Sequence, residues 1–232
     1  MQKLLNLDDF IFIDLTHSLS SAIPHWGSGC GFHNKIETDY VKDSDSVKFR
    51  TQSIQMVAGI GTHMDAPSHC IPGAANISEI PLQSLIAPCR VINVSDKAHE
   101  RYSVSVDDIK TFENDYGIIP KGTLVIVYTG WDKWWSQPEK YRNELIFPSI
   151  SKEATEMLLA RDIAGLGIDT LSPDAGDSGF PVHQLILGAG KYIVENIANA
   201  EKLDAVGYVI ALPMKIQDGT EAPIRLVGVK SK

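Results

Sequence analysis

Three side chains that can bind a metal ion lie close together in the segment GIGTHMDAPSH (59–69): His63, Asp65 and His69. In an extended chain, residues two positions apart project to the same side, so His63 and Asp65 point together, about 6.6 Å apart along the chain. Pro67 interrupts regular strand pairing and allows His69 to turn back toward the same point. Imidazole and carboxylate together suit zinc, manganese or iron. Spacing alone leaves a second interpretation open, in which these are packed or surface side chains.

A second pair, His183 and Glu195, lies in HQLILGAGKYIVE (183–195). His183 is expected on a short helix, and Glu195 follows a glycine-containing turn and an apolar stretch. One histidine and one carboxylate at this distance indicate little by themselves. The sequence contains no G-x-S-x-G elbow, no Walker sequence and no dinucleotide fingerprint, so these hydrolase and nucleotide-binding classes are not indicated.

Three tryptophans in GWDKWW, Trp131, Trp134 and Trp135, follow the end of an expected strand. They can line a pocket for an aromatic ligand, or they can cover the edge of the core or a subunit contact. The structural role is the favoured interpretation, because large aromatic side chains mostly serve packing.

The strands and helices that must position these residues are mixed along the chain. Helices are expected over 106–116, capped by Ser105 and ended by Gly117; over 152–162, capped by Ser151; and over 182–187, following Pro181. Strands are expected over 10–15, 47–57, 86–94, 123–129, 163–168, 205–212 and 223–229, with a loop at 24–32. The strand at 123–129 is apolar throughout, so burial on both faces is predicted. Without repeats or linkers, this mixture indicates one domain of α/β or α+β architecture over residues 1–232.

Composition narrows the environment and the partners. The 232 residues carry a formal net charge of −8 and no basic cluster, which argues against nucleic acid and anionic membranes as partners. No apolar run approaches the roughly 20 residues of a membrane span, and the N-terminus does not resemble a signal peptide. Three cysteines without a C-x-x-C pair argue against a disulfide framework. A cytoplasmic location is therefore expected.

Five segments, in order, are similar to those of one family. They are FIDLTHSLSSAIPHW (12–26), GTHMDAPSH (61–69), GIDTLSPD (167–174), FPVHQLILGAGKYIVENI (180–197) and LPMKIQDGTEAPIRLVGV (212–229). The second resembles the signature H-x-G-T-H-x-D-x-P-x-H. The chain thus resembles the putative cyclase superfamily, which includes bacterial kynurenine formamidases and isatin hydrolases.

This resemblance implies a swivelling β/β/α domain of the α/β class with a mixed sheet core, assembled as a homodimer or homotetramer. It implies a divalent metal ion, zinc or manganese, with Asp65 between two metal positions. His69, His183 and Glu195 would complete one position, and His63 would belong to the other. Trp26, in the family's P-x-W position, and its neighbour His25 are the expected contacts for a flat small-molecule substrate.

The sequence departs from the signature at Gly59, where the family has its first histidine. Three outcomes are open at this point. The ion can occupy the other position, held by Asp65, His69, His183 and Glu195. A nearby side chain, such as Gln55 or His33, can replace the lost ligand. Alternatively, the site is weak and the protein is catalytically impaired.

The predicted function is metal-assisted hydrolysis of an amide, a formamide (as in arylformamidases), or a cyclic amide or lactone. Water made nucleophilic by the metal attacks the carbonyl, and His69 or His183 carries the proton to the leaving group. The alternative is a non-catalytic homologue that binds a small ligand at an impaired metal site. A purely structural oligomer component is a weaker hypothesis, since it gives no reason for the metal-binding pattern.

Overall fold

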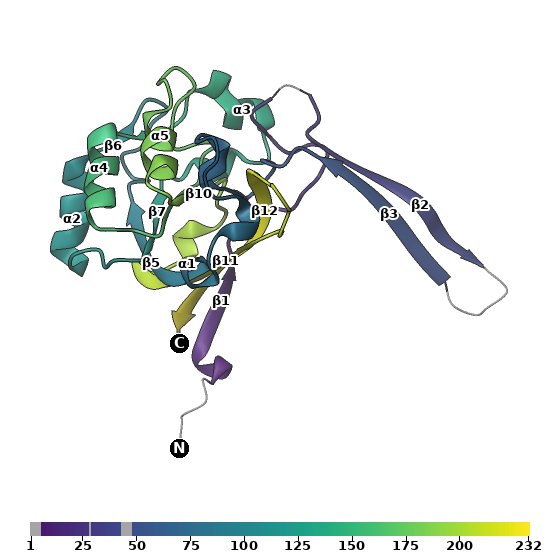
Figure 1. Cartoon of the computed structure of the whole chain (residues 1–232), viewed down its shortest axis with the longest axis horizontal. Coiled ribbons are helices and arrows are strands. Elements are labelled where there is room, and N and C mark those ends of the chain that lie inside the picture. The colour runs from purple at the N-terminus through teal and green to yellow at the C-terminus, as the bar shows by residue number, and fades with distance from the viewer. Residues whose placement is uncertain (1–5, 28, 43–47) are drawn as a thin grey trace.

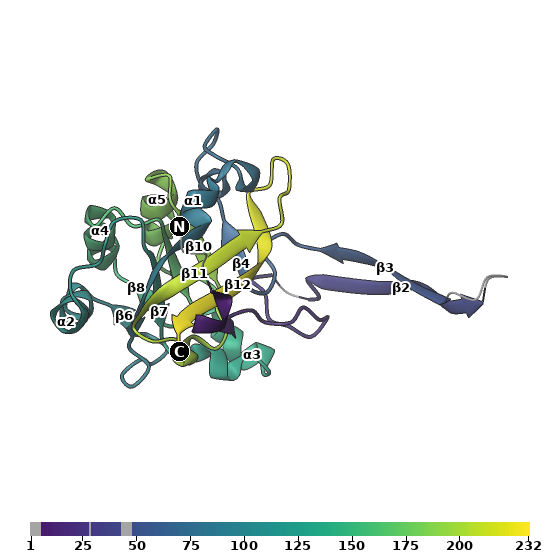
Figure 2. The ribbon, with the colours of Figure 1, turned by 90° about the horizontal axis from the view of Figure 1, so that it is seen from below.

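The computed structural model describes residues 6–27, 29–42 and 48–232 of the chain. Most elements form one body, from which strands β2 (Phe32–Lys42) and β3 (Lys48–Met56) project as a two-stranded arm (Figures 1 and 2). Both strands of the arm pair only with each other in the described part of the chain. The strand predicted over 47–57 is confirmed as β3, whereas β2 was not predicted.

The body is built on an eight-stranded mixed sheet whose order is β1-β12-β11-β5-β7-β9-β10-β4. The bounds are Phe10–Asp14 (β1), Glu221–Ser231 (β12), Val206–Pro213 (β11), Ile86–Asn93 (β5), Leu124–Tyr128 (β7), Gly165–Ile168 (β9), Tyr192–Glu195 (β10) and His63–Asp65 (β4). Strands β5, β7, β9 and β10 are parallel, and the other pairings are antiparallel. An additional pairing of β12 with β4 closes the sheet into a barrel-like core. The expected α/β class with a mixed sheet core is confirmed.

Helices surround this sheet (Figure 1). They are α1 (Leu82–Leu85), α2 (Val106–Tyr116), α3 (Pro138–Arg142), α4 (Lys152–Ala160) and α5 (Pro181–Gly188). Short 3₁₀ turns lie at Leu7–Asp9, Pro67–His69, Ile77–Glu79, Trp131–Trp134, Asn143–Leu145 and Ala200–Lys202, and two short strands, β6 (Ser103–Val104) and β8 (Ser149–Ile150), pair with each other. In the described part of the chain, no helix combines the length and apolarity that crossing a membrane requires.

Local sequence signals explain the ends of these helices. Ser105 caps α2 in a reciprocal capping box with Asp108, and Gly117, with a φ of 84°, ends the helix. Ser151 accepts a hydrogen bond from the backbone N–H of Ala154 at the start of α4. Pro181 opens α5. The helices predicted at these places are confirmed, with α4 two residues shorter than the predicted range ending at Asp162.

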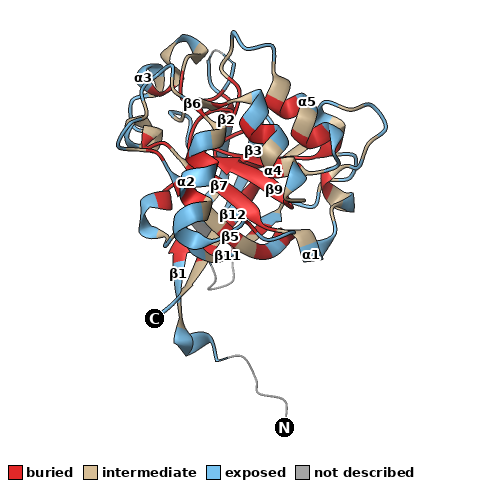
Figure 3. Cartoon of the chain, turned by 90° about the vertical axis from the view of Figure 1, so that its left-hand side faces the viewer, coloured by how far each residue is buried: buried red, intermediate tan, exposed pale blue. Residues whose placement is uncertain are grey.

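Strand β7 divides the core in two. Leu124 and Ile126 belong to one buried cluster within the sheet, and Val125 and Val127 belong to a second cluster beneath α2, α4 and α5. Side chains alternate across a strand, so β7 is buried on both faces, as its sequence predicted (Figure 3). The central strands are therefore packed on both faces. This packing fixes the position of the strand ends, from which the candidate functional residues project.

The tryptophans of GWDKWW form a third apolar cluster with Tyr141 and Phe147. The indole of Trp135 stacks on the imidazole of His17 with a ring separation of 3.8 Å, and burial lowers the pKa of His17 to about 4. Trp131 donates a hydrogen bond from its ring nitrogen to the carbonyl of Tyr141. These contacts agree with the packing role that was favoured for the tryptophans.

Candidate metal centre

The register of three neighbouring strands brings four acidic or imidazole side chains to one face of the sheet. In β4, His63 lies opposite Glu195 of β10, and Asp65 lies opposite Glu221 of β12. Directly opposed residues of antiparallel strands project to the same face. His63 and Asp65, two positions apart, share that face as predicted. The sheet thus delivers two carboxylates from outside the signature segment to the same point.

Two further histidines reach this point from outside the sheet. His69 ends the 3₁₀ turn that begins at Pro67, and His183 lies in the first turn of α5. Nε2 of His183 is 3.6 Å from Oδ2 of Asp65 and 3.4 Å from Oε1 of Glu195. Nδ1 of His69 is 3.4 Å from Oε2 of Glu221. Three imidazoles and three carboxylates therefore converge.

The buried carboxylates at this point lack hydrogen-bond donors. Among the described residues, both oxygens of Asp65, which is fully buried, and Oε1 of Glu195 have no hydrogen-bonding partner. Nε2 of His63 lies 3.4 Å from Oδ1 of Asp65, and Nε2 of His183 lies 3.6 Å from Oδ2 of Asp65 and 3.4 Å from Oε1 of Glu195, which is long for a hydrogen bond. Buried carboxylates are costly unless they are paired or coordinate a metal ion. The orphaned oxygens therefore fit a bound cation.

The spacing of the donor atoms agrees with this interpretation. Donors about 2.1 Å from a tetrahedrally bound ion are separated from one another by about 3.4 Å. Two overlapping sets, each with ligand atoms within 4.8 Å of one another, share Asp65: one with His69 and His183, the other with His63 and Glu221. The predicted place of Asp65 between two metal positions thus has a geometric counterpart.

Outer hydrogen bonds orient two of the imidazoles. Nδ1 of His183 lies 2.8 Å from Oδ2 of Asp174, and Nδ1 of His63 lies 2.9 Å from the carbonyl of Gly61. When Nδ1 of each ring donates its hydrogen in these contacts, the lone pair of Nε2 points toward the centre. This arrangement is typical of metal-binding histidines. Asp174 also accepts the backbone N–H of His183, which ties it to the start of α5.

The carboxylates create a strongly negative field. Burial lowers the pKa of His183, but the surrounding carboxylates, first that of Asp174 and then that of Asp65, raise it to about 12. For His63, burial is likewise outweighed by the neighbouring carboxylates, which raise its pKa well above the usual value. A negative field that favours a proton on each of these rings also favours a metal cation bound in place of the protons.

These side chains lie in a cavity of about 430 Å³. Leu171, Phe180 and Trp26 supply apolar surface, and the rings of Trp26 and Phe180 are 5.7 Å apart. His25 lies apart from this lining: its ring is buried under the loop and its Nε2 lies 2.9 Å from the carbonyl of Gly29. Of the two predicted substrate contacts, only Trp26 is at the cavity.

All five ligands predicted from the sequence, His63, Asp65, His69, His183 and Glu195, are brought together. The two suggested replacements for the missing histidine are not among them. His33 and Gln55 lie opposite each other on the arm. Both are exposed, because the arm projects away from the body and does not line the cavity. Sequence reasoning missed Glu221 and Asp174, although each lies within a segment that resembles the family.

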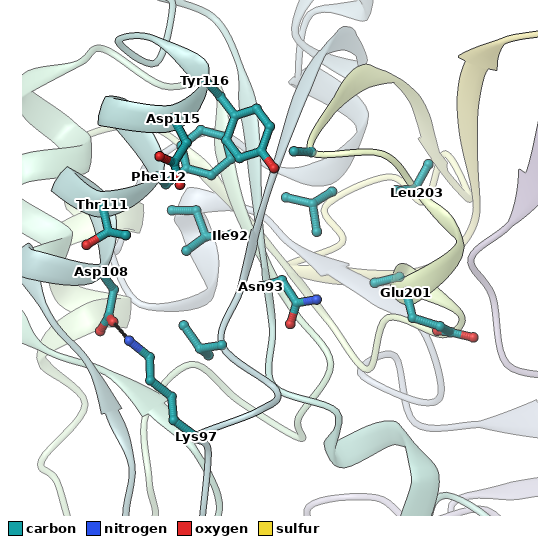
Figure 4. A pocket seen from close by; sticks show the side chains of 14 residues that line it. Ile92, Asn93, Lys97, Asp108, Thr111, Phe112, Asp115, Tyr116, Glu201 and Leu203 are labelled. Atoms are coloured by element: carbon teal, nitrogen blue, oxygen red, sulfur yellow. Dashed lines mark hydrogen bonds and ion pairs between the residues drawn. The ribbon is translucent and has the colours of Figure 1, made fainter.

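A second cavity, of about 330 Å³, lies between α2 and the end of β5 and is shown in Figure 4. Its lining includes Lys97, Asp108, Asp115 and Glu201. Asp108 pairs with Lys97, so the most buried charge in this cavity is already neutralised. None of its described residues forms a metal-type cluster.

Comparison with known proteins agrees with this geometry. Residues 13–175 match the model of the family described as "Putative cyclase". The chain is 33% identical to an isatin hydrolase from Roseibium aggregatum in an alignment of 206 positions that covers 82% of this chain and 78% of the relative. It is 29% identical to a kynurenine formamidase from Paracidovorax citrulli in an alignment of 184 positions that covers 75% of this chain and 77% of the relative. A crystal structure of an isatin hydrolase bound to the product analogue thioisatinate superposes with a TM-score of 0.89 at 29% identity, covering 97% of this chain and 94% of that one. The chain belongs to the cyclase family.

Proposed function

We propose that this protein is a metal-dependent hydrolase that cleaves the C–N bond of an aryl formamide or of a cyclic amide. The observation that carries the proposal is the pair of orphaned oxygens of Asp65, fully buried at the base of an open cavity. The relatives named kynurenine formamidase and isatin hydrolase supply the substrate class.

The residues that would hold the ion, zinc or manganese, are those that surround Asp65: His63, His69, His183 and Glu195. When bound, such an ion supplies Lewis acidity, which makes water nucleophilic near neutral pH and polarises a carbonyl group. The protein fixes the donors, since Asp174 orients His183 and the carbonyl of Gly61 orients His63. The sheet register keeps His63 and Asp65 from separating.

The two predicted proton carriers differ in their surroundings. Nδ1 of His183 is held by Asp174, while Nε2 faces the carboxylates of the centre at 3.4 to 3.6 Å without a hydrogen bond, so this ring is suited to a ligand role. The side chain of His69 is 33% exposed at the cavity. When it is not occupied as a ligand, His69 is therefore the better placed to pass a proton to a leaving group, because it reaches both the centre and solvent.

The apolar part of the cavity supports a flat, aromatic substrate. Trp26 and Phe180 stand at its rim, and Leu171 adds further apolar surface. A volume of about 430 Å³ lies within the usual range of small-molecule sites. An aryl amide would place its ring against these side chains and its carbonyl toward Asp65 and the imidazoles.

The experiment is hydrolysis of isatin and of N-formylkynurenine by protein supplied with manganese or zinc. We expect turnover of at least one substrate and its loss in Asp65→Ala, with circular dichroism showing an intact fold. Asp115→Ala, the same substitution in the second cavity, is the matched control and should keep full activity. Turnover that is unchanged in Asp65→Ala would refute the proposal.

Elemental analysis separates the enzyme from the alternative of a non-catalytic binder. Near-stoichiometric metal in the purified protein, together with turnover, supports the hydrolase. A metal-free protein that binds isatin without hydrolysing it supports the binder. The first outcome is expected, because no lysine or arginine in the described part of the chain pairs with Asp65 or Glu195.

We also propose that the chain assembles with copies of itself, as a homodimer or homotetramer. The arm exposes large apolar side chains, among them Phe49 (64% exposed) and Ile54 (60%). An isolated two-stranded hairpin is marginally stable in water, and exposed apolar surface of this kind favours a protein contact. Light scattering coupled to size exclusion tests this. A monomer at micromolar concentration would contradict it, whereas an oligomer that dissociates in Phe49→Lys would support it.

A further inference from the structure

The place of the missing histidine is filled by another side chain. A Cβ atom built on Gly59 would overlap Oε1 of Glu221 and would lie 3.2 Å from Nε2 of His63. The backbone of Gly59 is outside the left-handed region, so a residue with a side chain is conformationally allowed there. The group that such a side chain would have to displace is the carboxylate of Glu221. A side chain at position 59 and the carboxylate of Glu221 therefore compete for one space beside His63.

The fold fixes Glu221 in this space. It is the first residue of β12 and lies opposite Asp65 of β4, so both carboxylates share one face. Donor atoms of His63, Asp65 and Glu221 lie within 4.8 Å of one another. In the described part of the chain, the cationic partner within ion-pair distance of Glu221 is His69, at 3.4 Å. No lysine or arginine among the described residues holds this carboxylate away from the centre.

We propose that Glu221 is a metal ligand that, with His63 and Asp65, replaces the histidine lost at Gly59. This inference rests on the proposed metal dependence of the protein. The second, independent observation is the fully buried Asp65, whose two oxygens have no donor and are shared by both candidate sets. Relative to the family signature, the ligands of this metal position thereby change from two imidazoles and one carboxylate to one imidazole and two carboxylates.

This exchange changes which ion the position prefers. Carboxylate oxygens suit manganese, whereas imidazole nitrogens favour zinc. The extra negative charge of Glu221 also offsets the loss of a neutral ligand by stronger attraction for any divalent cation. The Glu221 position therefore has a smaller preference for zinc over manganese than the same position with a histidine at residue 59.

The test is equilibrium binding of manganese and of zinc, by calorimetry and by the electron paramagnetic resonance signal of manganese, without any substrate. In Glu221→Ala we expect one manganese equivalent to be lost or its affinity to fall at least about tenfold. Glu221→Gln retains the shape but lacks the charge and should show a similar loss. Glu201→Ala, an exposed carboxylate beside the second cavity, is the matched control and should bind as the wild type does.

A double substitution tests the exchange directly. Gly59→His with Glu221→Ala removes the overlap and restores an imidazole, so zinc affinity should recover while the zinc-to-manganese affinity ratio rises at least about tenfold over wild type. Wild-type manganese stoichiometry and affinity in both Glu221→Ala and Glu221→Gln would overturn the inference and leave the proposed function standing. A wild-type protein that binds neither ion would overturn both.

Discussion

The two cavities have comparable volumes, about 430 and about 330 Å³, yet they differ in the state of their buried carboxylates. In the cavity beside α2, Asp108 accepts hydrogen bonds from the backbone N–H and hydroxyl of Ser105 and from the hydroxyl of Tyr102, and it pairs with Lys97. In the cavity around Asp65, no described residue gives this carboxylate a hydrogen-bond donor, a lysine or an arginine. A carboxylate satisfied by its own protein serves stability, whereas an orphaned one requires something from outside.

The same contrast explains why volume is a poor guide to function here. Both cavities contain several acidic residues, and the second also contains Lys97, which resembles the beginnings of a binding site. The charge of Lys97, however, is paired with Asp108, the carboxylate that also closes the capping box of α2. In the cavity around Asp65 the ionisable groups come from β4, β10, β12 and α5, and their convergence serves no helix or turn.

The largest expected difference between the cavities is the response to metal removal. Treatment with a chelator should lower turnover at least about a thousandfold, because Lewis-acid stabilisation of the transition state is worth several kcal/mol. Added manganese or zinc should restore it. The rate of hydrolysis before and after dialysis is the measurement. Full activity in protein that has been shown to contain no metal would contradict the proposed role of the metal in turnover.

A smaller effect is expected from the residue that orients His183. Asp174→Asn keeps the shape of the side chain but weakens the hydrogen bond to Nδ1, so metal affinity should fall about 10- to 100-fold. Asp177→Asn is the control: it alters an exposed aspartate of the same loop, which pairs with Arg101 instead. Calorimetry with manganese measures both. Equal affinities for the two variants would show that Asp174 does not act through His183.

In the α2 cavity, the corresponding substitution should affect stability and leave metal binding unchanged. Asp108→Ala removes the capping box and the partner of Lys97 and should cost about 2 kcal/mol of unfolding free energy. Asp107→Ala, in the same helical turn but fully exposed to solvent, should cost less than about 0.5 kcal/mol. Urea unfolding gives both values. Altered manganese affinity in Asp108→Ala would mean that the two cavities are coupled.

The contrast also shows what sequence could foretell. Helices α2, α4 and α5 were predicted because Ser105, Ser151 and Pro181 act on their own neighbours. Strand β2 was missed because its side chains are largely exposed and show no apolar alternation. Strand β10 was missed because it is short and buried between β9 and β4. Closure of the sheet depends on the pairing of β12 with β4, which no local pattern encodes.

The candidate site follows the same division. The signature segment and the resemblance were enough to select five of the converging residues. Glu221 required the register of β12 against β4, since a carboxylate near the end of the chain carries no signal of its own. The one available hint was a glycine where the family has a histidine, which implies that another side chain fills the space. The role of Asp174 likewise depends on the start of α5, which lies beside it only in the folded chain.

The smallest expected effect concerns pH and the α2 cavity. Burial raises the pKa of Asp108, but Lys97 and Ser105 outweigh it and hold the pKa below its usual value. The carboxylate therefore stabilises the protein at pH values above the unfolded-state pKa of about 4, and this contribution is lost as the pH falls through the lower pKa of the folded state. The difference in unfolding free energy between wild type and Asp108→Asn should thus be constant from pH 5 to 7 and shrink below about pH 4. Urea unfolding of both proteins across this range measures it, and the cavity around Asp65, which both proteins share, cancels in the difference. A difference that persists undiminished at pH 2.5 would mean that the charge of Asp108 is not what holds the start of α2.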